Sequence, residues 1–331
     1  MTSMPSADDL TQRLRELVRT GRFREALETY RSAGDADARA DARLLAATAS
    51  TRLGELSQAE SLADDALHRF AERGDFDGRM RALNLLGVIG FERGRLPEAE
   101  LRLTEALSLA YRLEDSLIAA RASNNLASVA HLRGRPEEAV GLYRGALLGY
   151  QRLGDRRGTA ESYHNLGLTY RQLADYDEAE KAVTQAVRHA ESVGEPTLMA
   201  LTSGGRAELR IDQGDTALAL PDLDRAFRMA ELAGDVIGMA ELRRIRAVAA
   251  WREGRYEEAA GEAEAGRHTA EEHGVALLGA ECAALAALAY RAQGRTDIAE
   301  ARRAEAVEVF RSLGAVKLLE RFDADWSASS G

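Results

Sequence analysis

The sequence predicts an all-α solenoid, built from helix pairs that repeat along the chain. The composition of the chain and a turn sequence that recurs at a fixed spacing predict it. Hydrophobic residues make up 45% of the 331 residues, whereas aromatic residues make up 5% and only five residues are proline. This alanine-rich composition favours closely packed helices over sheets, which prefer β-branched and aromatic side chains. A turn sequence also recurs at a fixed spacing. We therefore expect one repeat array over residues 1–331 rather than several globular domains.

The repeat is set by a turn followed by Glu-Ala or a close variant. It starts at positions 54, 94, 134, 174, 214, 254 and 294, each 40 residues after the last, and follows a shorter first interval from Gly21. A second turn lies halfway between, from Gly34-Asp35 through Gly154-Asp155 to Gly314. Glycine suits the residue after a helix, and aspartate caps the next one. Each unit is therefore predicted to be helix A, turn, helix B, turn.

Small residues recur inside each unit at fixed positions. On helix B, Ala99 and Ala106 flank Leu103, and twelve residues before Ala99 lies Gly87 on helix A. The same register returns around Leu166-Gly167. It resembles the tetratricopeptide repeat, in which these residues let helices A and B approach closely. Because that repeat is usually 34 residues long, HEAT or armadillo repeats, with periods near 40, are the structural alternative.

Extended repeats of this length resemble those of kinesin light chain, of Rap-type peptide-sensing regulators and of sensor domains in bacterial transcription activators. The resemblance implies a right-handed superhelix whose A helices line the concave face. We expect about eight helix pairs, the first running from Ala7 to Ser32. A capping helix is expected over residues 315–324, followed by a disordered tail over residues 327–331.

Charge and cysteine content limit the function classes. The formal net charge of −10 disfavours a global grip on nucleic acid or anionic lipid. Cys282 is the single cysteine, so neither an intramolecular disulfide nor a thiolate metal cluster can form. The first ten residues do not read as a signal peptide, and no apolar run approaches the ~20 residues of a membrane span. We expect a cytoplasmic protein, and the arginine bias resembles proteins of GC-rich bacterial genomes.

Asparagines on the predicted concave face are the principal candidate site. Asn is a mediocre residue inside a helix, yet four of them fall mid-helix in consecutive repeats, and a side-chain amide can pair with both N–H and C=O of an extended peptide. Arginines and histidines flank them, and the alternative is that all of these bond only to neighbouring helices. The candidate peptide-binding residues are Asn84, Asn124, Asn125, Asn165, Arg81, Arg121, His131, His164 and Arg171.

A second candidate surface spans the sixth and seventh repeats. Gly204-Gly205 falls mid-helix, and arginine replaces the leucine of other repeats at positions 206 and 246. A buried arginine needs a partner, and Asp212, Asp222, Asp224 and Glu241 are available. The surface is open to interpretation as a hinge, an anionic-ligand pocket, a self-association face, or local divergence. Its residues are Arg206, Arg210, Arg243, Arg244, Arg246 and Trp251.

The sequence thus favours a non-enzymatic scaffold that holds an extended peptide in its concave groove. It contains no phosphate-binding loop, HExxH or GxSxG motif, so we expect no catalytic residue, metal or cofactor. One alternative is a regulator that responds to a ligand or signal peptide and acts through a partner. Another is an enzyme on a helical scaffold, with His131 and His164 as acid and base. A homodimer is also open.

Overall fold

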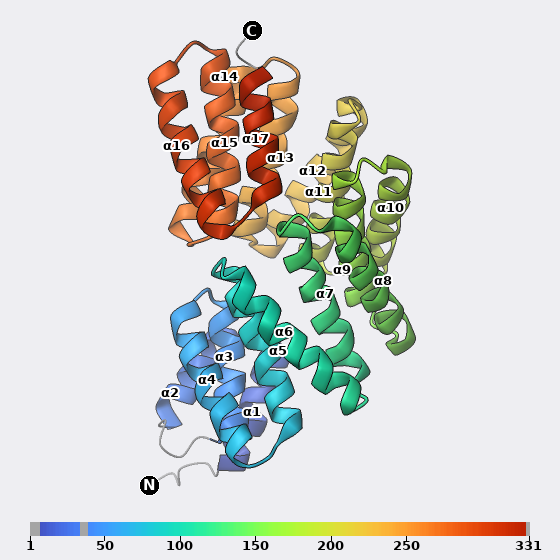
Figure 1. Cartoon of the computed structure of the whole chain (residues 1–331), viewed down its shortest axis with the longest axis vertical. Coiled ribbons are helices and arrows are strands. Elements are labelled where there is room, and N and C mark those ends of the chain that lie inside the picture. The colour runs from blue at the N-terminus through green and yellow to red at the C-terminus, as the bar shows by residue number, and fades with distance from the viewer. Residues whose placement is uncertain (1–6, 34–38, 329–331) are drawn as a thin grey trace. The chain divides into compact units, whose positions relative to one another are not determined.

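The computed structural model describes residues 7–33 and 39–328, and in these ranges it has seventeen helices and no strand. Figure 1 shows them joined by short turns. In chain order they are α1 (Ala7–Arg19), α2 (Phe23–Ala33), α3 (Ala40–Arg52), α4 (Leu56–Glu72), α5 (Phe76–Glu92), α6 (Leu96–Arg112), α7 (Ser116–Leu132), α8 (Pro136–Leu153), α9 (Arg156–Gln172), α10 (Tyr176–Val193), α11 (Pro196–Asp212), α12 (Thr216–Ala233), α13 (Val236–Arg252), α14 (Tyr256–Glu272), α15 (Ala276–Ala292), α16 (Thr296–Leu313) and α17 (Val316–Ala328). The all-helical prediction is confirmed.

The chain divides into two compact units, residues 1–126 (unit 1) and residues 127–331 (unit 2), with the boundary inside α7. Odd-numbered helices up to α15 are the A helices, and even-numbered helices are the B helices. In both units A helices pack against the B helices that follow them, as α5 does on α6 and α9 on α10. Neighbouring A helices also touch, α3 with α5 in unit 1, and α9, α11, α13 and α15 in sequence in unit 2. Each unit therefore has a continuous row of A helices.

The turns have the chemistry that the sequence predicts. Glycines between helices adopt a left-handed backbone, as Gly94 does at φ 71°. The two turns without glycine keep that conformation at Glu114 (φ 56°) and Ala174 (φ 57°). Asp155 accepts a hydrogen bond from the Gly158 amide at 2.9 Å and so caps α9. The turn at Gly34-Asp35 lies outside the described residues.

The small-residue register brings helices A and B together. A Cβ atom at Gly167 would lie 2.5 Å from Cγ1 of Val183, and one at Gly87 would overlap the side chain of Leu103. Each unit has an apolar core in which alanine is the most frequent buried residue. Glycine is thus required at positions 87 and 167, where α5 meets α6 and α9 meets α10.

The C-terminal capping helix is longer than predicted. It runs from Val316 to Ala328 rather than over residues 315–324, so Ser327 and Ala328 are helical instead of part of a tail. Phe322 and Trp326 bury themselves against the last helix pair, and this apolar anchoring carries the helix past its expected end. The remaining tail residues, 329–331, lie outside the described residues. No described helix is long and apolar enough to cross a membrane.

Candidate ligand-binding surface on the A helices

In unit 1 the candidate residues lie on α5 and α7. The Oδ1 atom of Asn84 is buried and has no hydrogen-bond partner, and Asn124 and Asn125 are half-buried. Arg81 is held in place, because it donates to Asp41 at 3.1 Å and to Asp77 at 2.9 Å. Arg121 is exposed. The side-chain amides of Asn84 and Asn125 therefore have more unused hydrogen-bonding capacity than Arg81.

In unit 2 the two candidate histidines are largely buried. His131 shares a hydrogen bond of 3.2 Å with the hydroxyl of Thr169. His164 is only 6% exposed, and its Nδ1 atom has no hydrogen-bond partner. Burial, reinforced by the charge of Arg171, lowers the pKa of each imidazole to about 4. Both rings are therefore neutral at physiological pH.

Arg171 belongs to a buried ion network that the sequence analysis did not assemble. Its guanidinium lies 2.9 Å from Glu208 on α11, and Arg244 on α13 donates to the same carboxylate at 2.8 Å. Arg244 also donates to Glu241 at 2.6 Å. Burial alone would raise the pKa of Glu208, but the two guanidinium groups outweigh burial and hold it well below its usual range. The network ties α9, α11 and α13 together.

Two further carboxyl groups extend this network. Asp212 lies 3.5 Å from Arg171 and accepts a hydrogen bond from Arg252 at 2.7 Å. Glu281 on α15 stands beside Arg244. The pKa of Glu281 is raised to about 7, because burial and the charges of Glu241 and Glu208 together outweigh the lowering effect of Arg244. Glu208 and Glu281 were not among the predicted site residues. The sequence does hold a signal that could have found them. Residues of opposite charge lie on neighbouring A helices at a spacing about one helical turn less than the 40-residue repeat.

The arginines that replace leucine in the sixth and seventh repeats have ionic partners on helix B. Arg206 makes a two-pronged contact with Asp222 at 2.7 and 2.5 Å, and Arg210 reaches the same carboxylate at 2.7 Å. The guanidinium of Arg246 lies 3.8 Å from the centre of the Phe227 ring. Arg246 also donates to Glu262 at 3.1 Å, and Arg243 donates to the same carboxylate at 2.9 Å.

Two of the four expected partners are confirmed, Asp222 for Arg206 and Arg210 and Glu241 for Arg244. Asp212 pairs instead with Arg171 and Arg252, and Glu262, which was not expected, holds Arg243 and Arg246. Trp251 packs against the apolar cluster of the C-terminal helices.

The glycine pair on α11 is a close-packing device. The helix runs unbroken from Pro196 to Asp212. A Cβ atom at Gly204 would lie 2.8 Å from Leu242 on α13, and one at Gly205 would lie 2.5 Å from the ring of His164 on α9. Both glycines thus make room for neighbouring A helices, which argues against the hinge interpretation.

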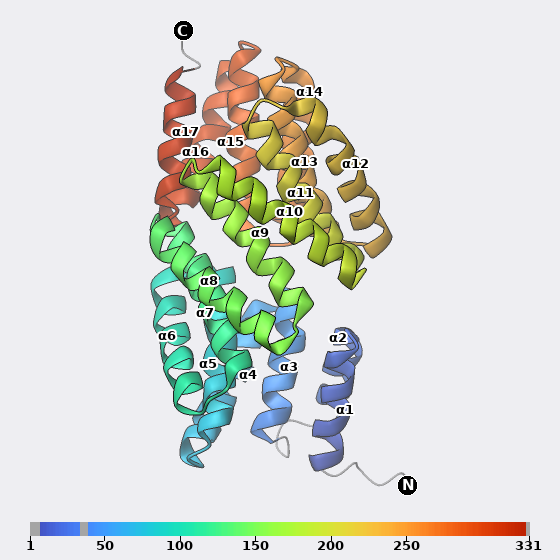
Figure 2. The same ribbon diagram turned by 90° about the vertical axis from the view of Figure 1, so that its right-hand side faces the viewer.

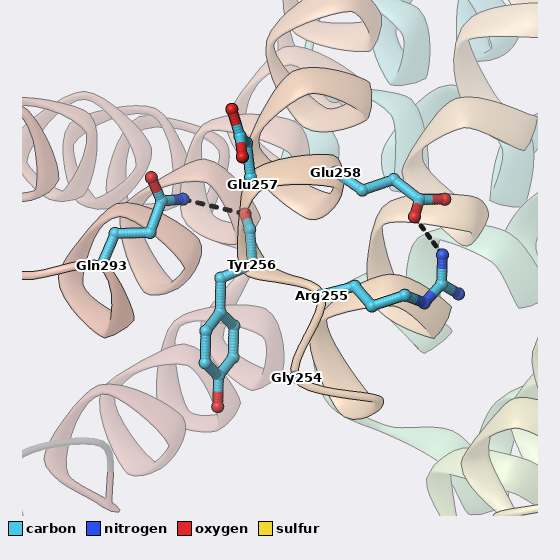
Figure 3. Close-up of a pocket in the computed structure, with 6 residues that line it drawn as sticks. All are labelled: Gly254, Arg255, Tyr256, Glu257, Glu258 and Gln293. Atoms are coloured by element: carbon cyan, nitrogen blue, oxygen red, sulfur yellow. Dashed lines mark hydrogen bonds and ion pairs between the residues drawn. The ribbon is translucent and has the colours of Figure 1, made fainter.

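A hollow elsewhere in unit 2 offers no better candidate. It lies at the turn before α14 and is lined by Gly254, Arg255, Tyr256, Glu257, Glu258 and Gln293 (Figure 3). Two of its polar contacts are internal, since Gln293 donates to the Tyr256 carbonyl at 2.9 Å and Arg255 pairs with Glu258. Among the described residues, no group of His, Cys, Asp and Glu is arranged to hold a metal ion.

Comparison with known proteins identifies the repeat. Two family models described as tetratricopeptide repeat match the chain, one at residues 118–192 and the other at residues 52–110 and 205–269. No curated protein sequence matches it. Among solved structures, BtubC (BKLC) from P. vanneervenii is 24% identical, with a TM-score of 0.52; the match covers 69% of this chain and 90% of that one.

Two Rap structures are similar over more of the chain. The Rap conjugation gene regulator of plasmid pLS20, in complex with the Phr* peptide, is 17% identical and has a TM-score of 0.68; the match covers 84% of this chain and 75% of that one. A Rap protein complexed with Competence and Sporulation Factor is 14% identical and has a TM-score of 0.65; the match covers 98% of both chains. At these identities the likeness concerns the fold.

Proposed function

Because this chain belongs to the tetratricopeptide repeat family, we propose that it is a non-enzymatic scaffold that holds an extended protein or peptide segment on its A helices. Two structures of similar fold were solved with a peptide or signalling factor bound, which supports a ligand of this class. The proposal does not rest on that likeness alone. It rests on the positions of the four asparagines.

All four asparagines of the chain lie on A helices, at Asn84, Asn124, Asn125 and Asn165. Asn125 and Asn165 are half-buried, and their side-chain amides make no hydrogen bond to another described side chain. The Oδ1 atom of Asn84 is buried and unpaired. A buried polar group without a partner costs about 1–3 kcal/mol. This unused capacity is the observation that carries the proposal.

An extended peptide backbone fits this capacity. Each amide offers one acceptor and two donors, and a peptide unit needs one of each. A partly dry surface strengthens such hydrogen bonds relative to water. We propose that each unit presents its own amides to the ligand, Asn84 and Asn125 in unit 1 and Asn165 in unit 2, while Asn124, which already has an interaction of its own, stays a prediction. Arg121 and Arg81 would flank the first group.

The remaining candidates of unit 2 would support the surface instead of contacting ligand. His131, His164 and Arg171 bond or pack within the unit, so we propose that they fix the A helices. Neutral, buried imidazoles are poor acids and bases at neutral pH, which supports the non-enzymatic assignment. A homodimer remains a prediction.

The test is capture of partners from source-cell extract with the full chain, followed by calorimetric titration of the captured partner. Asn125→Ala and Asn165→Ala, made singly and together, should weaken binding at least tenfold for the pair while the circular dichroism spectrum stays unchanged. Gln185→Ala is the matched control, because it removes a half-buried amide from a B helix. Equal affinity for all variants would contradict the proposal.

A further inference from the structure

Opposite charges alternate along four successive A helices of unit 2. From α9 to α15 the residues concerned are Arg171, Glu208, Arg244 and Glu281. They are spaced by 37, 36 and 37 residues, and neighbouring helices of this row, which Figure 2 shows, are in contact. Ion pairs join the first three residues, at 2.9 Å for Arg171 with Glu208 and at 2.8 Å for Glu208 with Arg244. Glu281 continues the alternation on the last A helix.

The hydrogen bonds of Arg244 go to two other carboxylates. Its guanidinium donates to Glu208 at 2.8 Å and to Glu241, on its own helix, at 2.6 and 3.0 Å. Within the described part of the chain, Glu281 forms no ion pair and no side-chain hydrogen bond. The groups that attract its negative charge are Arg244 and Arg171, and neither of them is bonded to it.

The ion network around Arg244 contains one carboxyl group more than its guanidinium groups pair with. Its cations are Arg171, Arg244 and Arg252, and its carboxyl groups are Glu208, Asp212, Glu241 and Glu281. Each of the first three carboxyl groups has an ion pair with one of these arginines, whereas Glu281 has none. Arg321 adds an exposed cation, but it lies 3.6 Å from Asp212 and so does not serve Glu281. With all four carboxyl groups ionised, one negative charge would stay uncompensated.

Glu281 has apolar surroundings along its own helix. The helical turns on either side of it consist of alanine, leucine, glycine and cysteine, and its side chain is half-buried. Removing a carboxylate from water is costly unless a cation pairs with it, and the nearby carboxylates of Glu241 and Glu208 repel it. Burial and these two charges outweigh the attraction of Arg244 and raise the pKa of Glu281 to about 7. The group is therefore protonated in mildly acidic conditions.

The partly buried cations of the other helices in contact with α15 have partners of their own. These helices are α14, α16 and α17. The ion pairs on α14 and α16 are formed by Glu264, Arg267, Arg302 and Glu305. On α17 the exposed cations are held by Glu320, which pairs with Lys317, and by Asp212, which lies beside Arg321. The charged groups that face Glu281 are thus Arg244 and Glu241 on α13, Glu208 on α11 and Arg171 on α9.

We propose that Glu281 binds a proton in place of the missing cation, which makes α15 pack more firmly on α13 in mildly acidic than in mildly alkaline conditions. The inference goes beyond the proposed function and does not depend on a ligand. When protonated, the carboxyl group is neutral and can donate a hydrogen bond. When ionised, it places a further negative charge beside Glu241 and Glu208.

The direction of the effect follows from the state that holds the proton more tightly. The folded-state pKa of Glu281, about 7, lies above the value of about 4.3 in an unfolded chain, so the folded unit binds the proton more tightly. Its stabilising effect is therefore complete below about pH 4.3 and is lost as the pH rises to about 7. Because local opening of α15 releases Glu281 to water, the effect should also be measurable without global unfolding.

The first test follows the carboxyl carbons of carbon-13-labelled glutamate in the full chain by NMR while the pH is varied. A resonance that is absent from Glu281→Gln should titrate with a midpoint near pH 7. Glu241→Gln should lower this midpoint, because it removes a neighbouring negative charge. Glu257→Gln is the matched control and should leave it unchanged, since Glu257 is exposed on α14 and has no ion pair with a described residue (Figure 3). A midpoint of about 5 or below, the range of an ordinary glutamate, would overturn the proposal, as would a neutral-range titration that persists in Glu281→Gln.

The second test measures hydrogen exchange of the α15 amides, corrected for the intrinsic effect of pH on exchange. The ratio of the rate in the unmodified chain to the rate in Glu281→Gln should rise by roughly 40-fold from pH 5 to pH 7 and then level off. A ratio that does not change with pH would refute the proton site. Partner capture with the asparagine variants is a separate measurement, so failure of the proposed function leaves this inference standing, and the reverse also holds.

Discussion

Removal of the Glu208 carboxylate is the most direct test of how unit 2 holds together. Glu208 is 7% exposed and is the only carboxylate within ion-pair distance of both Arg171 and Arg244 in the described part of the chain. Glu208→Gln keeps the size of the side chain and removes its charge. Two buried guanidinium groups then lose their shared counter-ion. Breaking a buried pair from one side costs about 3–5 kcal/mol, and we expect a loss of that size.

The loss should depend on pH in a defined direction. The folded-state pKa of Glu208 is held below its usual range, so its stabilising effect is complete above the unfolded value of about 4.3 and declines as pH falls through the folded value. The direct contribution of Glu208 to the free-energy difference between wild type and Glu208→Gln should therefore be constant from pH 8 to about pH 5. Because Glu208 also helps to raise the pKa of Glu281, the variant ionises Glu281 more easily, and the difference should be smaller at pH 8 than at pH 6. Below about pH 5 the difference should shrink.

The assay is urea unfolding by circular dichroism, with hydrogen exchange of α9, α11 and α13 recorded beside it because a repeat array need not unfold in one step. Glu138→Gln is the control, since it breaks an exposed pair with Arg135 and should cost less than about 1 kcal/mol. A triple replacement of Arg171 and Arg244 by Met and Glu208 by Leu should restore most of the loss. A Glu208→Gln effect as small as that of the control would refute this account.

Three further predictions follow from the turns, the histidines and the glycines. Glu114→Gly relieves a left-handed residue and should stabilise its turn by about 0.5–1 kcal/mol, measured by urea unfolding. His131 and His164 have folded pKa values of about 4, so stability should fall as pH drops from about 6.5 to 4, and replacing both with Gln should flatten that slope. Gly205→Ala should destabilise the protein by about 1–3 kcal/mol, because the buried His164 ring blocks the new methyl group; Gly145→Ala, with open space around it, should stabilise α8 by up to about 1 kcal/mol.

Most of the fold could be predicted from the sequence, because the same physical requirements recur in each repeat. Glycine after each helix, aspartate at several helix starts and small residues where A meets B are local requirements that any one unit reveals. Even the exceptions at Glu114 and Ala174 obey the repeat, since both keep the left-handed backbone. The end of α17 was predicted too early because its anchor, Trp326, packs against α15 and α16, a contact that the local sequence pattern does not show.

The ion network could not be predicted in the same way. Arg171, Glu208 and Arg244 lie on three successive A helices, and which of them meet depends on how far each helix is shifted along its neighbour. The 40-residue period aligns equivalent positions, but the observed pairs are 37 and 36 residues apart. The shift of about one turn comes from helix packing, which a single repeat does not specify.

The structure changes which irregularities of the repeat point to ligand binding. Arg206 and Arg246 replace leucines, yet they form ion pairs with Asp222 and Glu262 on the B helices. In these repeats an ionic contact between helices A and B therefore replaces an apolar one. Arg244, at an asparagine position of earlier repeats, is likewise committed to Glu208. The asparagines differ, because the side-chain amides of Asn125 and Asn165 make no hydrogen bond to another described side chain. The irregular arginines therefore serve contacts between helices of unit 2, and the amides are where binding should be tested first.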